Sequence, residues 1–306
     1  MGGVTGPLLV VDAPSILYRS YFAMPSDILG TDGKPVGAVL GFIRFVMTEI
    51  DDCVDAAKGI PGPRGVVICF GAEEASYRVE LLPQYHAHRD PMPEDLRPQF
   101  EQAAEVCALL GWRVAQHSTL EADDLLGAYA KLEHAARRPA RLVTGDRDIF
   151  QCVTANVHVR FPQGAGKGVK TVDPAGVAEW VGCAPSQVPE LIALRGDTSD
   201  GIPGAAGIGA KTAAALLAEW GTLERVIAKA EAVASGKDRP FSPLSQKRAE
   251  SIAGSADDLR TYLKVAQLQP VAVDRPADHE TDWAGGAAAA KERGMLRLAE
   301  ALERRA

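Results

Sequence analysis

Acidic residues gather in four groups, at positions where their side chains could bind metal ions. Carboxylates brought to one place repel one another unless protons or cations neutralise them. Hard divalent ions such as Mg²⁺ and Mn²⁺ prefer oxygen ligands, and two such ions about 4 Å apart can activate water for an in-line phosphodiester displacement. The pattern therefore predicts a two-metal phosphodiesterase centre. Its candidate ligands are Asp12, then Glu121, Asp123 and Asp124, then Asp146 and Asp148, then Asp197 and Asp200.

Each group also has a purely structural interpretation. Ser118 and Glu121 have the spacing of a helix capping box, and acidic residues are favoured in the helical turn that would follow. Asp148 could cap a helix, and the last pair of aspartates could belong to an ordinary loop. Four separate structural explanations are less economical than one shared site, so we expect the groups to converge.

The elements expected to position these acids alternate between strands and helices. Short, largely β-branched apolar runs at 8–13, 65–71, 112–117 and 141–146 alternate with segments of helical periodicity such as 38–50 and 99–110. This alternation predicts an α/β fold with a mostly parallel central sheet flanked by helices. Binding groups gather at the carboxyl ends of such strands, where Asp12 and Asp146 stand.

From about residue 173 the pattern changes to helices separated by Gly and Pro. We expect helices at 174–181, 186–195, 210–220 and 222–234, a surface loop at 235–243, a weakly structured connector at 282–290 and a last helix at 292–304. The predicted domains are an α/β core at 1–172 with a short arch region at about 84–96, a helical lobe at 173–275, and a C-terminal connector and helix at 276–306.

A glycine-rich stretch, residues 201–212, leads directly into the predicted helix at 210–220. Free backbone N–H groups and the positive end of the helix dipole suit a phosphate there. The nucleotide-binding P-loop pattern is not met, because Ala210 precedes the lysine and no strand leads in. We therefore favour a nucleic-acid backbone contact over a nucleotide cofactor, with a flexible helix start as the structural alternative. The candidate DNA-binding residues are Gly204, Gly207, Gly209, Lys211 and Thr212.

Composition and charge limit the other possibilities. The chain has 306 residues and a formal charge of −7, which argues against bulk coating of nucleic acid. Without the eight candidate ligands the charge is −7 + 8 = +1, so the acidity is largely local to the predicted site. No apolar run approaches the roughly 20 residues of a membrane span, and the five scattered cysteines are expected to be core thiols. A cytoplasmic monomer with no membrane contact is expected.

Taken in order, the motifs resemble the 5′ nuclease (flap endonuclease) family, which includes the N-terminal nuclease domain of bacterial DNA polymerase I and free-standing bacterial 5′-to-3′ exonucleases. The resemblance covers about residues 8–265 and implies a PIN-like core with a helical hairpin that grips duplex DNA. The matching segments are VVDAPSILYRSYF (10–22), QYHAHRDPMPEDL (84–96), LEADDLLGAYA (120–130), LVTGDRDIFQCV (142–153) and ALRGDTSDGIPGAAGIGAKTAAALL (193–217).

The resemblance implies roles for individual residues. It assigns the first four acids, through Asp124, to one metal position and the last four to a second. It implies that Tyr18 and Arg19 guide the nucleotide beside the cut and that Arg89 engages the scissile phosphate. It also implies that Lys211 contacts the duplex backbone, aided by a K⁺ ion at the glycine-rich hairpin.

Two departures from the family pattern fall on the chemical centre. The chain has Gly71 where the family has a first-site aspartate, and Glu73 or Glu74 would have to substitute for it. It has His86 where the family has an arch lysine, and a histidine can contact phosphate but is charged only part of the time near neutral pH. The first metal site is therefore expected to be weak.

The leading hypothesis is a 5′-to-3′ exonuclease and 5′-flap endonuclease that acts in DNA replication and repair, with Mg²⁺ or Mn²⁺ as its cofactor. Its partners would be DNA with 5′ ends, flaps or junctions. A second hypothesis is a structure-specific DNA-binding protein whose nuclease activity is weakened or lost because of Gly71. A third is a PIN-type ribonuclease, against which the glycine-rich hairpin and the second lobe count.

Overall fold

A six-stranded sheet forms the centre of the structure, a computed structural model that describes residues 6–164 and 167–306. The first five strands in the order β3-β2-β1-β4-β5 are parallel, and β6 runs antiparallel to β5. The predicted mostly parallel sheet is confirmed, but its last two strands were not predicted. The strands are β1 (Leu8–Asp12), β2 (Gly65–Phe70), β3 (Arg113–Gln116), β4 (Ala140–Val143), β5 (Val157–Pro162) and β6 (Val169–Val172).

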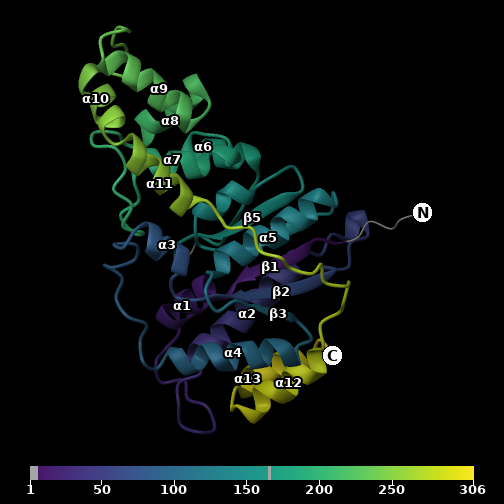
Figure 1. Cartoon of the computed structure of the whole chain (residues 1–306). Helices are drawn as coiled ribbons and strands as arrows, with labels where there is room; N and C mark the ends of the chain where they lie inside the picture. The colour runs from purple at the N-terminus through teal and green to yellow at the C-terminus, as the bar shows by residue number, and fades with distance from the viewer. Residues whose placement is uncertain (1–5, 165–166) are drawn as a thin grey trace.

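Alternate residues of the central strands feed two separate cores. Leu9 and Val11 of β1 face a core made with α1 (Ala13–Ala23), α2 (Gly37–Asp51) and α4 (Arg97–Leu109), whereas Leu8 and Val10 face α5 (Ala122–Ala135). All four residues are fully buried, so β1 is covered on both faces, as a parallel sheet requires. Figure 1 shows the sheet between these helical layers.

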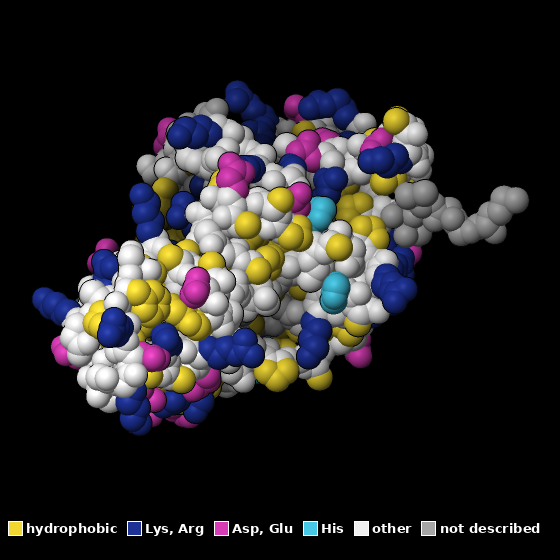
Figure 2. All heavy atoms as spheres, turned by 90° about the horizontal axis from the view of Figure 1, so that it is seen from above, with side chains coloured by type: hydrophobic (Ala, Val, Ile, Leu, Met, Phe, Trp, Pro, Cys, Tyr) yellow, Lys and Arg dark blue, Asp and Glu magenta, His cyan; other side chains and the backbone are white. Residues whose placement is uncertain are grey.

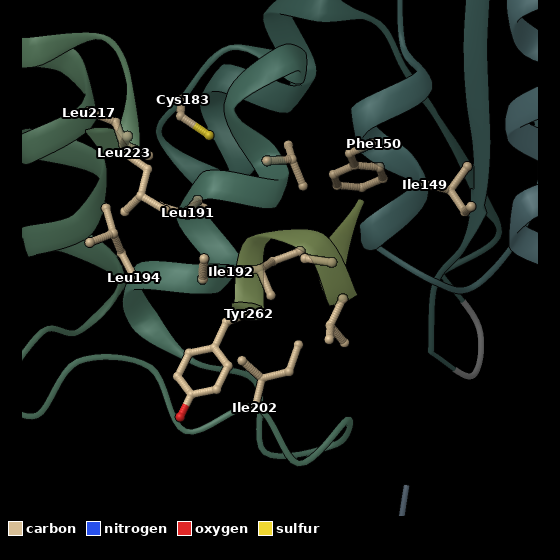
Figure 3. Packing of buried hydrophobic residues seen from close by; sticks show 14 of the residues in the cluster. Ile149, Phe150, Cys183, Leu191, Ile192, Leu194, Ile202, Leu217, Leu223 and Tyr262 are labelled. Atoms are coloured by element: carbon tan, nitrogen blue, oxygen red, sulfur yellow. The ribbon is translucent and has the colours of Figure 1, made fainter. Parts of the chain in front are cut away.

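The helical lobe continues one of these cores instead of forming its own. Phe150, in the short 3-10 segment after β4, packs toward Leu191 and Ile192, and Ile202 lies near Tyr262 (Figure 3). The lobe rises from one end of the sheet (Figure 1). Its helices are α6 (Pro174–Val181), α7 (Val188–Arg195), α8 (Ala210–Trp220), α9 (Leu223–Ala234), α10 (Gln246–Gly254) and α11 (Ala256–Ala266).

An extended strap, residues 267–282, leads from α11 back to the opposite end of the core. It ends in α12 (Trp283–Glu292), which packs against α4, and α13 (Leu296–Glu303), which packs against α12 (Figure 1). The expected connector at 282–290 is therefore wrong, because its alanines form a helix whose Ala287, Ala289 and Ala290 are buried. The small alanine side chains let α12 approach α4 closely.

Two remaining expectations concern the cysteines and membrane-spanning helices. Four of the five cysteines are buried and Cys152 is half-buried, none of them in a disulfide. Within the described ranges, the chain contains no helix with the length and apolar character that a membrane span requires.

Candidate active site

A cleft of about 1530 Å³ opens at the carboxyl ends of the central strands, between the sheet and the helical lobe. Tyr18, Arg89, His86 and Glu74 are among its lining residues. Seven of the eight candidate metal ligands also line it, whereas Asp124 does not. Those seven are Asp12, Glu121, Asp123, Asp146, Asp148, Asp197 and Asp200.

Thr144 links the acids that end β1 and follow β4. Its buried hydroxyl donates a 2.6 Å hydrogen bond to Asp12 Oδ2 and accepts one of 3.0 Å from the Asp146 N–H. Asp12 Oδ1 also accepts from the Ser15 N–H at 3.1 Å, because Asp12 is the N-cap of α1. The spacing of the acids did not point to Thr144, and its only sequence signal is a polar side chain at the end of an apolar strand.

Burial makes the central acids hard to ionise. It raises the pKa of Asp12 to about 6 and raises the pKa of Asp146, while Asp123 and Asp148 have pKa values well above the ordinary one for the same reason. Repulsion between neighbouring carboxylates adds to this: Asp146 contributes to the raised pKa of both Asp123 and Asp148. A divalent cation bound among them would relieve both effects.

Asp200 is the exception, because it has cationic partners. Burial acts to raise its pKa, but a hydrogen bond with His86 and the nearby charge of Arg89 outweigh this and lower it. Arg89 Nη2 lies 3.0 Å and His86 Nε2 lies 3.3 Å from Asp200 Oδ1. The His86 side chain is 1% exposed, so the phosphate contact considered for it is not available in this arrangement. Its imidazole stacks on Tyr85 instead.

Asp197 has its own arginine, which sequence reasoning missed. Arg195 Nη2 lies 3.0 Å from Asp197 Oδ2, while Asp197 Oδ1 accepts from the Ser199 N–H at 3.0 Å. Arg195 lines both the main cleft and a cavity of about 310 Å³ that reaches Ala210 at the start of α8. It therefore lies between the acids and the glycine-rich segment.

The Glu121 group has a different environment from the other acids. Glu121 and Asp124 form the capping box of α5. The Ser118–Glu121 box considered from the sequence is therefore wrong, because it lies three residues too early in the chain. Both carboxylates pair with Arg78, whose side chain is 4% exposed. Asp124 is fully buried and does not line the cleft, and its role as a metal ligand stays a prediction. Only Asp123 of this group has no such partner among the described residues.

Gly71 has no room for the aspartate that the family carries. A Cβ atom at this position would lie 2.2 Å from the Ala122 nitrogen and 2.3 Å from the Glu121 carbonyl carbon. The main chain at the start of α5 therefore occupies the space beside the strand end. Of the two possible substitutes, Glu73 is paired with Arg97 at 3.0 Å, and Glu74 is exposed at the cleft.

Of the two residues expected to guide the nucleotide, one lines the cleft and the other does not. Tyr18 lines the cleft and packs edge-on against Phe100, with ring centroids 6.0 Å apart. Arg19 is not among the lining residues, and its guanidinium donates to the Gln163 carbonyl. Arg89 lines the cleft with its side chain 50% exposed, which leaves it accessible to a ligand.

The glycine-rich segment contains both structural and open glycines. Gly204 has a φ of +68°, and a Cβ there would lie 2.3 Å from the Gly196 nitrogen, so the fold itself requires glycine. Gly209 has a φ of −91° and no atom within 4 Å of the place of a Cβ. Gly207, Lys211 and Gly209 are exposed, and Thr212 is half-buried. The open positions leave room for another backbone to approach.

Lys and Arg side chains surround the lobe face without forming one continuous basic patch, and acidic side chains lie among them (Figure 2). Specific contacts would therefore have to carry nucleic-acid binding on this face.

Two family models match the chain. The N-terminal resolvase-like domain of 5′-3′ exonucleases matches residues 7–182, and their C-terminal SAM fold matches residues 183–282. A 5′-3′ exonuclease of Mycobacterium tuberculosis is 36% identical over 296 residues, which cover 90% of this chain and 86% of that protein. The thermostable DNA polymerase I of Thermus aquaticus is 33% identical over 280 residues, which cover 90% of this chain but 30% of the polymerase.

Solved structures share the fold. The T5 5′-exonuclease with bound zinc superposes with a TM-score of 0.64 at 19% identity, covering 97% of this chain and 98% of that one. The catalytic core of Rad2 in complex with a DNA substrate has a TM-score of 0.63 at 15% identity, covering 99% and 92%.

Substituting Gly71 should disturb the site instead of restoring it. Gly71→Asp, and even Gly71→Ala, would push the first turn of α5 away from the strand end, because the atoms in contact are main-chain atoms. We expect a loss of about 1–3 kcal/mol in the free energy of unfolding, measured by urea denaturation. Gly209→Ala, where the space is open, is the control and should change stability little. A more stable Gly71→Asp protein would contradict the steric argument.

The raised pKa of Asp12 should make stability fall as pH rises in the absence of metal. The folded protein retains the Asp12 proton up to pH about 6, whereas an unfolded chain releases it near its ordinary pKa of 3.8. Protonation therefore favours the folded state at low pH, and this contribution, on the order of 3 kcal/mol, is lost between pH about 4 and about 6.

Urea unfolding in chelator should show this loss in the wild type and a flatter profile in Asp12→Asn. The exposed Asp258→Asn is the control and should keep the wild-type slope. An unchanged slope in Asp12→Asn would show that other groups dominate.

Proposed function

The chain belongs to the 5′-3′ exonuclease family, and on that premise we propose that it hydrolyses DNA phosphodiester bonds near free 5′ ends with a divalent cation. The observation that carries the proposal is the set of buried and half-buried, mutually repelling acids at an open cleft. Seven of the eight predicted acids line that cleft. As a 5′-to-3′ exonuclease and flap endonuclease, it would act in DNA replication and repair.

The donor set suits Mg²⁺ or Mn²⁺, because it consists of carboxylate oxygens, and those of Asp12, Asp123, Asp146 and Asp148 have no basic nitrogen within 4.0 Å in the described ranges. Within residues 6–164 and 167–306 no three acidic, His or Cys side chains are already close enough to share one ion, so binding would draw the carboxylates together. Asp12, Asp123, Asp146 and Asp148 would hold the cation. When bound, it supplies charge neutralisation and a water molecule of lowered pKa.

The protein's own residues would position the DNA around this centre. Arg89 lines the cleft with an exposed guanidinium, and it would bind the scissile phosphate while remaining near Asp200. Tyr18 would support the adjacent nucleotide. Gly207, Gly209 and the start of α8 would receive the duplex backbone, with Lys211 as the nearby cation and K⁺ bound at the same hairpin.

A second candidate function is DNA binding by structure with little cleavage. It is favoured by the Gly71 position, where main-chain atoms fill the space of a missing ligand. Both functions require the glycine-rich segment to bind duplex DNA, and only the first requires the acids to support hydrolysis.

Asp146→Asn separates these two functions. Removing this charge from the centre should lower the cleavage rate of a 5′-labelled flap duplex in Mg²⁺ or Mn²⁺ by at least about 100-fold, because it removes a direct contribution to charge stabilisation. DNA affinity should change little. Wild-type protein that binds the flap tightly but cuts it in neither metal would favour the second function, and cleavage that survives in Asp146→Asn would show that the site is elsewhere.

The glycine-rich segment can be tested by duplex binding alone, in chelator. Gly209→Leu should weaken binding by about tenfold, because its side chain would fill the space left for the DNA backbone. Lys211→Ala should weaken binding and reduce the slope of log affinity against log salt by about 1.

Lys291→Ala is the matched control, since Lys291 is an exposed lysine on α12, at the opposite end of the molecule (Figure 1). It should leave both affinity and salt slope unchanged. Equal effects of the two lysine substitutions would mean that binding is not localised on the lobe.

A further inference from the structure

We propose that Arg78 is a fixed counter-cation that takes Glu121 and Asp124 out of the metal-binding set. Divalent cations then bind at the carboxylates without a basic partner, which are Asp12, Asp123, Asp146 and Asp148. Arg78 would thus be a positioning residue within the proposed active site. The inference rests on the proposed function, because it concerns the same cleft. It also reassigns two of the four residues that the family resemblance places at the first metal position.

Arg78 is held rigidly between the two acids. It lies in α3 (Ser76–Leu81), and its Nη1 is 3.1 Å from Glu121 Oε2 and 3.2 Å from Asp124 Oδ2. Its Nε donates to the Val265 carbonyl at 3.0 Å, and its guanidinium carbon lies 4.9 Å from the centre of the Tyr77 ring. A buried guanidinium with this many partners cannot move aside without leaving charges unpaired.

Asp124 has donors on both carboxylate oxygens. Oδ1 accepts from Arg78 Nη2 at 3.2 Å and from the Gln269 N–H of the strap at 2.8 Å. Oδ2 accepts from Arg78 Nη1 at 3.2 Å and from the Glu121 N–H at 3.3 Å. The residue is fully buried, so a metal ion could reach it only by displacing the strap or the arginine.

Both carboxylate oxygens of Glu121 also have partners, although Glu121 borders the cleft. Its Oε1 accepts from the Ala75 N–H at 2.7 Å. Its Oε2 accepts from the Tyr85 hydroxyl at 3.1 Å and contacts Arg78 Nη1. The main chain of Glu121 also fills the space beside Gly71, so the aspartate that would accompany it in a metal site is absent.

The other central acids contrast with this pair. Within the described ranges, no Lys, Arg or His nitrogen lies within 4.0 Å of Asp12, Asp123, Asp146 or Asp148. Asp12 accepts from the Thr144 hydroxyl and the Ser15 N–H, and Asp146 accepts from the Asp148 N–H. Such neutral donors orient a carboxylate without neutralising it. A cation therefore gains more from these four acids than from the two that already face an arginine.

Mn²⁺ binding to the full chain without DNA tests the inference, with free Mn²⁺ counted by electron paramagnetic resonance. Asp124→Asn should leave Mn²⁺ affinity within about threefold of wild type, whereas Asp148→Asn should weaken it by more than about tenfold. Arg78→Gln should bind more Mn²⁺ than wild type, because it uncovers two buried carboxylates. Arg260→Gln, which breaks only exposed ion pairs with Glu224 and Asp257 outside the cleft, is the matched control and should bind as wild type does.

A tenfold loss in a folded Asp124→Asn protein, or no gain in a folded Arg78→Gln protein, would overturn the inference. If these buried substitutions prevent folding, a wild-type crystal soaked in Mn²⁺ decides the question. No anomalous peak should lie within roughly 2.5 Å of a carboxylate oxygen of Glu121 or Asp124, and a peak there would overturn the inference. Wild-type protein that binds no Mn²⁺ would overturn both this inference and the proposed metal dependence.

Discussion

Carboxyl groups that are crowded together at the ends of β1 and β4 resist ionisation, and the surrounding fold is arranged around them. Asp12 accepts from a hydroxyl and a main-chain N–H, and Asp146 accepts from a main-chain N–H. Burial raises the pKa of Asp12, Asp146 and Asp148, and within the described ranges no basic side chain lies within 4.0 Å to offset their ionisation. Such an arrangement costs stability, and proteins keep such costs at functional sites. The covered parallel sheet supplies the rigidity, because β1 is buried on both faces and its end cannot relax toward water.

The lobe and the sheet share one hydrophobic core beside these acids. Asp148 begins the 3-10 segment whose next two residues, Ile149 and Phe150, pack in the core shared with the lobe helices (Figure 3). From the lobe side, Asp200 reaches back to His86 and Arg89 of the segment after α3. The glycine-rich segment therefore has a set position relative to the acids. A DNA duplex bound at the glycine-rich segment would therefore lie at a distance from the acids that the packing of the lobe on the sheet determines.

Charge compensation differs between the two sides of the cleft. On the side of Glu121, an arginine, a tyrosine hydroxyl and main-chain N–H groups satisfy the carboxylates, and the main chain fills the place beside Gly71. On the side of Asp146, repulsion between acids is left for a cation to relieve. The fold thus retains the family's outline while dividing its acids into a structural pair and an open group. This division concerns chemistry more than architecture, because the sheet order and the lobe are intact.

Local sequence patterns were enough to predict the α/β class, the change to helices after residue 172, the convergence of seven acids and the glycine-rich start of α8. These follow from local periodicity, strand-end position and residue type, which act over a few residues. The strands β5 and β6, the helix α12, the pairing of Arg78 and the burial of His86 were decided only by the tertiary structure. Arg78 meets Asp124 across 46 residues, and no local pattern encodes which of several carboxylates a distant arginine will neutralise once the chain packs.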